Sequence, residues 1–333
     1  MANPIINIGH GNPTFFRPWW NEVKIFPNID TRANFYYEYQ EDDPIELIRA
    51  THKFHSIFGT DCSSSWLAYG NGSTQVIHAT LYTISKRLNR PIIVAYAPPV
   101  YMLMHEFLSN CNFATVTFDL TRTDIDVEIV IDPNNPSGEH RKQKSAAPYV
   151  IFDRAYNWPI YLAYDGLPNS SLTPTSSKSN HITVYTISKA LGMGGLRLGW
   201  AFINDEELAN EIKRSIVLIG ICPNSFSIQA AYLVFTQFFD SEELCYRYYE
   251  LKTIIESRRD LVAQCKSFTV TNKTGPYAWI KSKDGSDIAK FLLDNYNIKV
   301  YSGTMFGSTA EYARLSLICD GDDFLDAIER LYQ

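Results

Sequence analysis

Short runs of β-branched and aromatic residues alternate along this chain with longer segments of helical periodicity. Before residue 204, strands are expected at 92–96, 114–118, 128–131, 149–152, 182–187 and 198–203, and helices at 47–58, 72–88 and 100–110. Strands that are apolar throughout are buried on both faces of a sheet. The alternation therefore predicts an α/β fold with a largely parallel sheet that helices cover on both sides.

The pattern changes after residue 204. Helices are expected at 205–216, 227–239 and 241–265, and a smaller α+β tail follows with strands at 274–281, 299–302 and 313–318 and helices at 286–295 and 322–332. A chain of 333 residues exceeds what one hydrophobic core usually supports, so two domains are expected. We expect a large α/β domain over residues 38–240 and a small α+β domain built from residues 1–37 and 241–333.

One lysine stands where the predicted strand 182–187 gives way to a glycine-rich turn. The segment reads Thr-Ile-Ser-Lys-Ala-Leu-Gly-Met-Gly-Gly-Leu-Arg-Leu-Gly, with Lys189 near its start and Arg197 eight residues later. An amine held beside a rigid loop that carries a cation suits a Schiff base to a phosphorylated aldehyde cofactor. A lysine among glycines after a strand also fits a purely structural role, and the segment alone leaves that alternative open.

Polar side chains follow two other predicted strands. Asn135 lies in Asp-Pro-Asn-Asn-Pro-Ser-Gly after strand 128–131, where an amide can bond the phenolic oxygen of the cofactor. Asp153 ends strand 149–152, where a buried carboxylate would keep a pyridine nitrogen protonated, and Tyr156 can donate to the same phenolic oxygen. An ordinary Asx turn at Asn135 and a helix cap at Asp153 are the structural alternatives.

A phosphate-binding turn is indicated before helix 72–88, because exposed N–H groups at a helix N-terminus attract anions. The candidate phosphate ligands come from the first turn of this helix and from the lysine segment: Gly72, Ser73, Thr74, Thr186 and Arg197. Simple capping by Ser and Thr is the alternative. Tyr101, after two prolines, is placed to stack on the pyridine ring. Arg314, in a late strand, presents a fork that fits the α-carboxylate of an amino acid.

In this order the motifs span residues 70–317 and resemble those of fold-type I pyridoxal-phosphate enzymes, the aminotransferase class. A narrower resemblance, to the alliinase and plant tryptophan aminotransferase family, rests on five segments: Asn7–Thr14, Trp19-Trp20, Pro133–Pro136, Ala155–Pro159 and Arg197–Trp200. The resemblance implies pyridoxal 5'-phosphate as cofactor and a seven-stranded, mainly parallel sheet with a smaller α+β domain. It also implies a homodimer with shared active sites, in which Tyr39 reaches the cofactor phosphate of the neighbouring subunit.

The resemblance further implies an aminotransferase that moves the amino group of an L-amino acid to a 2-oxo acid. Lys189, Asp153 and Tyr156 would be its catalytic residues, and Gly11, Asn135 and Arg314 would bind the substrate. An alliinase-like C–S β-lyase, acting on a β-substituted cysteine, needs the same groups and stays open. A binding protein without activity is disfavoured, because all the expected cofactor groups occur together.

Composition narrows the expectation further. A net charge of −6 gives no reason to expect a nucleic acid or an anionic membrane as partner. Six cysteines occur without a C-x-x-C pair, which argues against a metal site or a disulfide framework and fits a reducing compartment. The N-terminus lacks a signal-peptide pattern, and no apolar run approaches about 18 residues. We expect a cytoplasmic protein with small-molecule substrates. Five aromatic residues (Phe15, Phe16, Trp19, Trp20 and Trp158) suggest an aromatic substrate such as tryptophan, although aromatics make up 14% of the chain.

Overall fold

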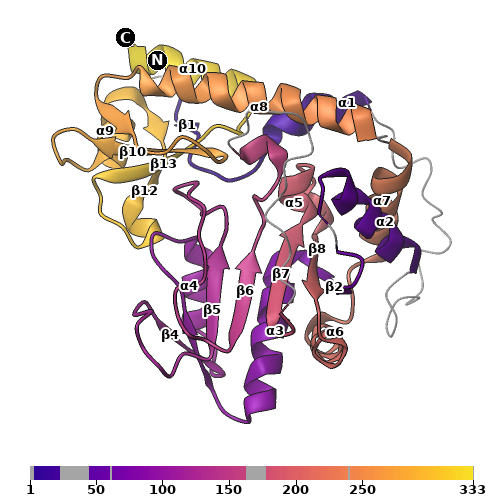
Figure 1. Cartoon of the computed structure of the whole chain (residues 1–333). Helices are drawn as coiled ribbons and strands as arrows, with labels where there is room; N and C mark the ends of the chain where they lie inside the picture. Colours follow the sequence, from indigo (N-terminus) through magenta and orange to yellow (C-terminus); the bar gives the residue numbers. More distant parts are fainter. Residues whose placement is uncertain (1–3, 23–44, 61, 163–177, 239–240, 333) are drawn as a thin grey trace.

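A seven-stranded sheet forms the centre of the molecule (Figure 1). The computed structural model describes residues 4–22, 45–60, 62–162, 178–238 and 241–332. The sheet order is β2-β8-β7-β6-β5-β3-β4, with strands β2 (Trp66–Asn71), β3 (Ile92–Ala95), β4 (Ala114–Thr117), β5 (Val127–Ile131), β6 (Tyr149–Asp153), β7 (His181–Thr186) and β8 (Leu198–Ile203). Only β8 runs antiparallel to its neighbours. The predicted α/β fold with a mainly parallel sheet is confirmed.

Helices pack on both faces of this sheet. They are α1 (Arg17–Glu22), α2 (Ile45–Ile57), α3 (Gly72–Leu88), α4 (Met102–Ser109), α5 (Ile187–Ala190), α6 (Glu206–Gly220) and α7 (Ser225–Leu233). Along β7 and β8 the side chains alternate between two cores. Val184 and Ala201 join the core under α3 and α6, whereas Tyr185 and Trp200 join the core that α2 and α7 cover. Both faces are apolar, which explains why these strands read as unbroken apolar runs.

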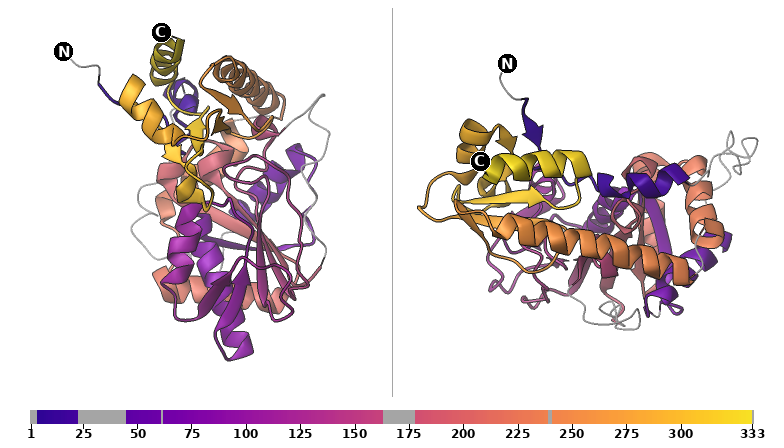
Figure 2. Two further views of the ribbon diagram at one scale, coloured as in Figure 1. Left: turned by 90° about the vertical axis from the view of Figure 1, so that its left-hand side faces the viewer. Right: turned by 90° about the horizontal axis from the view of Figure 1, so that it is seen from above.

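The C-terminal part builds a second, antiparallel sheet above the first. Its order is β12-β13-β10-β9, with β9 (Phe268–Val270), β10 (Tyr277–Ser282), β12 (Tyr301–Ser302) and β13 (Tyr312–Ser316), and the helices around it are α8 (Ser241–Ala263), α9 (Ile288–Tyr296) and α10 (Gly321–Tyr332). Figure 2 shows the long helix α8 extending from the side of α7 to this sheet. The N-terminal strand β1 (Ile6–Asn7) pairs with β11 (Ile298–Lys299), so the N-terminal segment is joined to the C-terminal part of the chain.

Three details differ from the predicted elements. The single strand predicted at 299–302 is wrong, because the segment divides at Val300 into β11 and β12, which belong to different sheets. The two strands divide at the point where the N-terminal segment passes against the backbone, because a Cβ on Gly9 would lie 2.9 Å from the Val300 carbonyl carbon. Strands β1, β2 and β9 were not predicted, since each is recognised by its cross-strand partner. The helix predicted at 227–239 ends as α7 at Leu233 and continues as a π-helical turn, Val234–Phe238.

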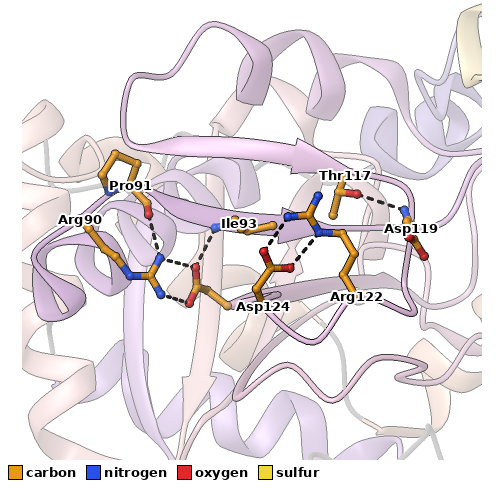
Figure 3. Close-up of polar contacts among 8 residues, drawn as sticks. Arg90, Pro91, Ile93, Thr117, Asp119, Arg122 and Asp124 are labelled. Atoms are coloured by element: carbon orange, nitrogen blue, oxygen red, sulfur yellow. Dashed lines mark hydrogen bonds and ion pairs between the residues drawn. The ribbon is translucent and has the colours of Figure 1, made fainter.

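Buried and exposed ion pairs hold the N-terminal ends of β3 and β5 (Figure 3). The Asp126 carboxylate, 5% exposed, accepts hydrogen bonds from the Arg90 guanidinium at 2.6 and 2.8 Å and from the Ile93 N–H at 2.8 Å. Arg122 and Asp124 form a second bidentate pair at 2.7 and 2.8 Å. Three donors offset the desolvation of Asp126. This network lies at the sheet edge opposite to the C-terminal strand ends, so it bears on stability rather than chemistry.

No helix in the described residues has both the length and the apolar character that a membrane crossing requires.

The junction of β8 with the start of α3 should tolerate no side chain at Gly199. A Cβ there would lie 2.3 Å from the Ser73 amide nitrogen and 2.5 Å from the Gly72 carbonyl carbon. We expect Gly199→Ala to lower the free energy of unfolding by about 1–3 kcal/mol, because backbone atoms cannot move aside cheaply. A Cβ on Gly195 would have no atom within 4 Å. Gly195→Ala should therefore change the free energy of unfolding by less than about 0.5 kcal/mol. Urea unfolding measures both, and equal midpoints would contradict the packing argument.

Candidate active site

The predicted site residues gather where the parallel strands end, beneath the C-terminal sheet (Figure 1). Asp153 is the last residue of β6, and Thr186 is the last residue of β7. Asn135 lies in the loop after β5, and Tyr101 precedes α4 in the loop after β3. The carboxyl ends of parallel strands meet at one edge of a sheet, which is where open α/β sheets bind ligands.

Lys189 lies in the one-turn helix α5, not at the strand end itself. Thr186 begins that helix, and its side chain accepts a hydrogen bond from the Ser188 N–H at 3.2 Å. The Lys189 Nζ donates to the carbonyl oxygen of Gly11 at 2.6 Å. Burial, with the positive charges of Arg314 and Arg197, lowers the pKa of Lys189 to about 8. Such a lysine supplies the unprotonated amine that attack on a carbonyl requires.

Asp153 is a buried acid close to this amine. Burial raises the pKa of Asp153 to about 6, although the Ala155 N–H, 3.1 Å from Oδ1, and the charge of Lys189 act in the opposite direction. A cation placed against the carboxylate would lower that pKa again. Asp153 is therefore suited to pair with a protonated ring nitrogen.

Tyr156 lies beside the lysine, with its ring centre 5.6 Å from the Lys189 Nζ. Its hydroxyl is hydrogen-bonded to the hydroxyl of Tyr277. Burial, more than any neighbour, raises the pKa of Tyr156 well above the usual value. Tyr156 therefore keeps its proton and can act as a hydrogen-bond donor.

Arg314 carries a buried charge that no carboxylate of the described residues neutralises. The residue is 2% exposed; its Nη1 donates to the Asn135 Oδ1 at 3.0 Å and its Nη2 to the Gly9 carbonyl oxygen at 2.8 Å. Its Nε has no hydrogen-bond partner in the described residues. A buried guanidinium that contacts only neutral acceptors is poised to bind an anion, and its planar fork matches a carboxylate.

The start of α3 has the features of an anion site. Its N-cap, Asn71, makes no side-chain bond to the first turn, so the N–H groups of Ser73 and Thr74 remain for an outside acceptor. Gly72 has φ +79°, and a Cβ there would lie 2.6 Å from the Arg197 Nη2. A glycine at position 72 therefore lets a cation come against the helix N-terminus, which suits a phosphate group.

Two of the predicted residues lie differently from the rest. The Thr186 hydroxyl is occupied by protein contacts, since it donates to the Leu198 carbonyl oxygen at 3.2 Å while capping α5. Tyr101 is half-buried, and its pKa is raised by burial and by nearby groups that include Tyr277 and Asp153. Tyr39 lies outside the described residues.

The aromatic residues near the N-terminus pack beneath the lysine turn. A Cβ on Gly192 would lie 2.5 Å from the Phe16 ring, and the Trp20 indole N–H donates to the Leu191 carbonyl oxygen at 2.8 Å. Trp158 is fully buried in the core beside the α2 residue Phe54. In this structure these rings support the loop and the core, so they do not argue for an aromatic substrate.

Sequence reasoning missed the residues that surround the Arg314 guanidinium. Its central carbon lies 4.2 Å from the Tyr277 ring centre, 4.9 Å from that of Phe306 and 5.1 Å from that of Tyr301. The carbonyl of Gly9 was also missed. The pairing of β10 and β12 with β13 brings Tyr277 and Tyr301 to Arg314, and Phe306 ends the helical turn Gly303–Phe306 that follows β12. A Gly-Pro-Tyr step before a strand was the one local signal available for Tyr277.

Two known protein families match this chain, and together they cover nearly all of it. The profile of the allinase family matches residues 6–225, and that of aminotransferase class I and II matches residues 140–331. The chain belongs to the alliinase family. Over 98% of its length it is 27% identical to tryptophan aminotransferase-related protein 2 of Oryza sativa subsp. japonica, of which 72% is covered. Alliin lyase of Allium cepa var. aggregatum is 23% identical over 96% of this chain and 79% of its own.

This alliinase-family chain also has the fold of solved aminotransferases. The aspartate aminotransferase from Rhizobium meliloti superposes with a TM-score of 0.75 at 18% identity, covering 99% of this chain and 90% of that one. The expected fold type I is confirmed. Alliinases and fold-type I aminotransferases depend on pyridoxal phosphate. The residues present fit that group. They supply an amine with a lowered pKa (Lys189), a buried acid (Asp153) and, beside an arginine, a helix N-terminus that begins with glycine.

The raised pKa of Asp153 predicts how the stability of the cofactor-free protein depends on pH. The folded protein holds this proton more tightly than the unfolded chain, so the stabilisation is present below pH 4 and is lost as the pH rises through about 6. Asp153→Asn should therefore stabilise the protein above pH 6, by on the order of 2 kcal/mol. The gain should shrink as the pH falls toward 4.

Asp205→Asn is the matched control, because asparagine can replace aspartate as the N-cap of α6. Thermal or urea unfolding between pH 4 and 8 measures both variants. A pH-independent difference for Asp153→Asn would show that burial of its charge is not the cause.

Proposed function

We propose that this protein is a pyridoxal-phosphate-dependent aminotransferase that moves the amino group of an L-amino acid to a 2-oxo acid. The observation that carries the proposal is a pair of cationic residues, Lys189 half-buried and Arg314 buried, that form no ion pair with a carboxylate of the described residues. Lys189 and Arg314 each contact a neutral backbone carbonyl, of Gly11 and Gly9 respectively. Lys189 is suited to bond the aldehyde of the cofactor, and Arg314 is suited to bind the carboxylate of the amino-acid substrate.

The residues that would hold the cofactor divide into three groups. Lys189 would bond its aldehyde, and Asp153 would pair with its ring nitrogen. Asn135 and Tyr156 would bond its phenolic oxygen and Tyr101 would lie against its ring, while Gly72, Ser73, Thr74 and Arg197 would bind its phosphate, with Thr186 holding the adjoining turn. When bound, pyridoxal phosphate supplies an electron sink that stabilises the charge left at the substrate α-carbon after proton removal.

The residues of the protein would then control the transfer of one proton, the α-proton of the substrate. Lys189 would be the general base that takes the substrate α-proton on its Nζ, and then the acid that gives this proton up again. Its lowered pKa suits both steps, because the amine must first be neutral and then give the proton up. Arg314 binds the carboxylate and so sets which bond of the α-carbon faces the lysine.

A C–S β-lyase is the second candidate, and the similarity to alliin lyase over 96% of this chain favours it. It would use Lys189 and Arg314 in the same way up to removal of the α-proton. The two reactions part afterwards, because elimination expels a β-substituent and needs no 2-oxo acid as acceptor.

The proposal includes a homodimer, with the large domain over residues 38–240 and the small domain from 1–37 and 241–333. Pairing of β1 with β11 supports grouping the N-terminal segment with the C-terminal part. Tyr39 of one subunit would reach the phosphate of the other. A cytoplasmic location, with amino acids and 2-oxo acids as substrates, completes the proposal.

Single-turnover chemistry separates the two reactions. The protein is loaded with pyridoxal phosphate, and single L-amino acids are added without any 2-oxo acid. An aminotransferase should lose its visible absorbance and release one equivalent of 2-oxo acid per site, with no ammonia. Continuous release of ammonia and pyruvate from a β-substituted cysteine would instead establish the lyase. Absence of any visible absorbance after loading would overturn both.

Lys189→Ala should abolish turnover and leave the fold largely intact, because the amine would act on the substrate while Thr186 caps α5, the helix that carries Lys189. A loss of at least about 10³-fold in kcat is expected for a general base that also binds the cofactor covalently. Lys86→Ala, at an exposed position on α3, is the control and should keep full activity. Appreciable multiple turnover by Lys189→Ala would refute the assignment.

A further inference from the structure

Two tyrosine hydroxyls meet between the two sheets. Tyr277, the first residue of β10, is fully buried. Its hydroxyl bonds that of Tyr156, and the two rings stand edge to face with centres 5.6 Å apart. Neither hydroxyl has another hydrogen-bond partner in the described residues. The pair therefore has two protons and uses only one of them.

The backbone fixes where Tyr277 points. Its carbonyl oxygen accepts hydrogen bonds from the Arg259 Nη1 and the Asn272 Nδ2, each at 2.9 Å. Arg259 also donates to the carbonyl of Gly275, two residues earlier. With Ser316 as its partner across the β10–β13 ladder, Tyr277 is held by the fold, independently of any ligand.

The Tyr277 side chain also contacts Arg314 and the N-terminal segment at Gly11. Its ring lies under the Arg314 guanidinium, 4.2 Å from ring centre to central carbon. A Cβ on Gly11 would lie 2.6 Å from the Tyr277 hydroxyl oxygen, so a glycine at position 11 is what makes room for that hydroxyl. Tyr277 thus touches the arginine, the N-terminal segment and Tyr156 at once.

We propose that Tyr277 is a positioning residue: its hydroxyl donates to Tyr156, which turns the Tyr156 proton toward the phenolic oxygen of the cofactor. The inference rests on the proposed function. If Tyr156 donated to Tyr277 instead, the Tyr277 proton would stay buried without an acceptor, which is costly. With Tyr277 as donor, both protons are used when the cofactor is bound. A hydroxyl that accepts a hydrogen bond is also a stronger donor.

Other groups surround the pair and are retained in the variants below. The charged and titratable side chains near it are Lys189 of α5, Arg314 of β13, Asp153 of β6, Tyr161 of the turn Pro159–Tyr161 and Tyr101 before α4. Tyr277→Phe removes one hydroxyl and leaves all of these, together with the ring under Arg314.

The test is a pH titration of the visible absorbance of the protein loaded with pyridoxal phosphate. Hydrogen bonding to the phenolic oxygen stabilises its negative form, so a weaker donor raises the midpoint. Tyr277→Phe should raise it by about half to one pH unit, the effect of losing roughly one hydrogen bond. The KM for the amino acid should change less than kcat, because the support of Arg314 is retained.

Two further variants decide whether the effect passes through Tyr156. In a Tyr156→Phe background, Tyr277→Phe should add no shift, whereas an additive shift would overturn the proposal. Tyr248→Phe is the matched control: it removes another buried hydroxyl, which donates to the Ala190 carbonyl, and should leave the midpoint unchanged. A parental midpoint in Tyr277→Phe would also overturn the inference, with the proposed function unaffected.

Gly11→Ala is the second route, should Tyr277→Phe fail to fold by circular dichroism. The added methyl group displaces the Tyr277 hydroxyl without altering any tyrosine, so the midpoint should again rise. An unchanged midpoint in Gly11→Ala would count against the proposal. If the parent protein shows no visible absorbance after loading, the proposed function fails first and the inference fails with it.

Discussion

The arrangement of the site depends on the charge of Arg314, which is buried and forms no ion pair with a carboxylate in the part of the chain that the structure describes. Taking a guanidinium out of water costs several kcal/mol unless polar or aromatic groups replace the lost hydration. Here the replacement comes from a backbone carbonyl at Gly9, an amide at Asn135 and three aromatic faces. These groups belong to the N-terminal segment, to the loop after β5 and to the C-terminal part of the chain, so one cation contacts three separate parts of the chain.

The same charge acts on the chemistry of the lysine. Arg314 is the largest charged contributor to the lowered pKa of Lys189, after burial itself. A positive potential that lowers the pKa of the amine also favours binding of an anion such as a carboxylate. In the proposed function, a substrate carboxylate bound to Arg314 would compensate its charge and would allow Lys189 to hold a proton more readily. Substrate binding and proton acceptance would thus be coupled through one residue.

The sequence allowed the local part of this site to be predicted. Asn135, Asp153 and Lys189 each follow a strand in a short, recognisable segment, and the common edge of a parallel sheet brings such residues together. Tyr277 could not be found in this way, because its role depends on the pairing of β10 with β13. Strand β2 was missed for the same reason, since its partner β8 lies more than a hundred residues away.

The rest of the site could not be predicted, because it depends on contacts between segments that are far apart in the sequence. Two glycines of the N-terminal segment show this. A side chain on Gly9 would collide with Tyr301, and one on Gly11 would collide with the Tyr277 hydroxyl. Their absence lets the segment lie directly against the C-terminal sheet and direct two carbonyls inward, one to Arg314 and one to Lys189. Carbonyls can orient both side chains without neutralising them, as carboxylates would. A backbone contact that only glycine permits therefore orients the lysine and the arginine and leaves the charge of Arg314 without a counter-ion from the described residues.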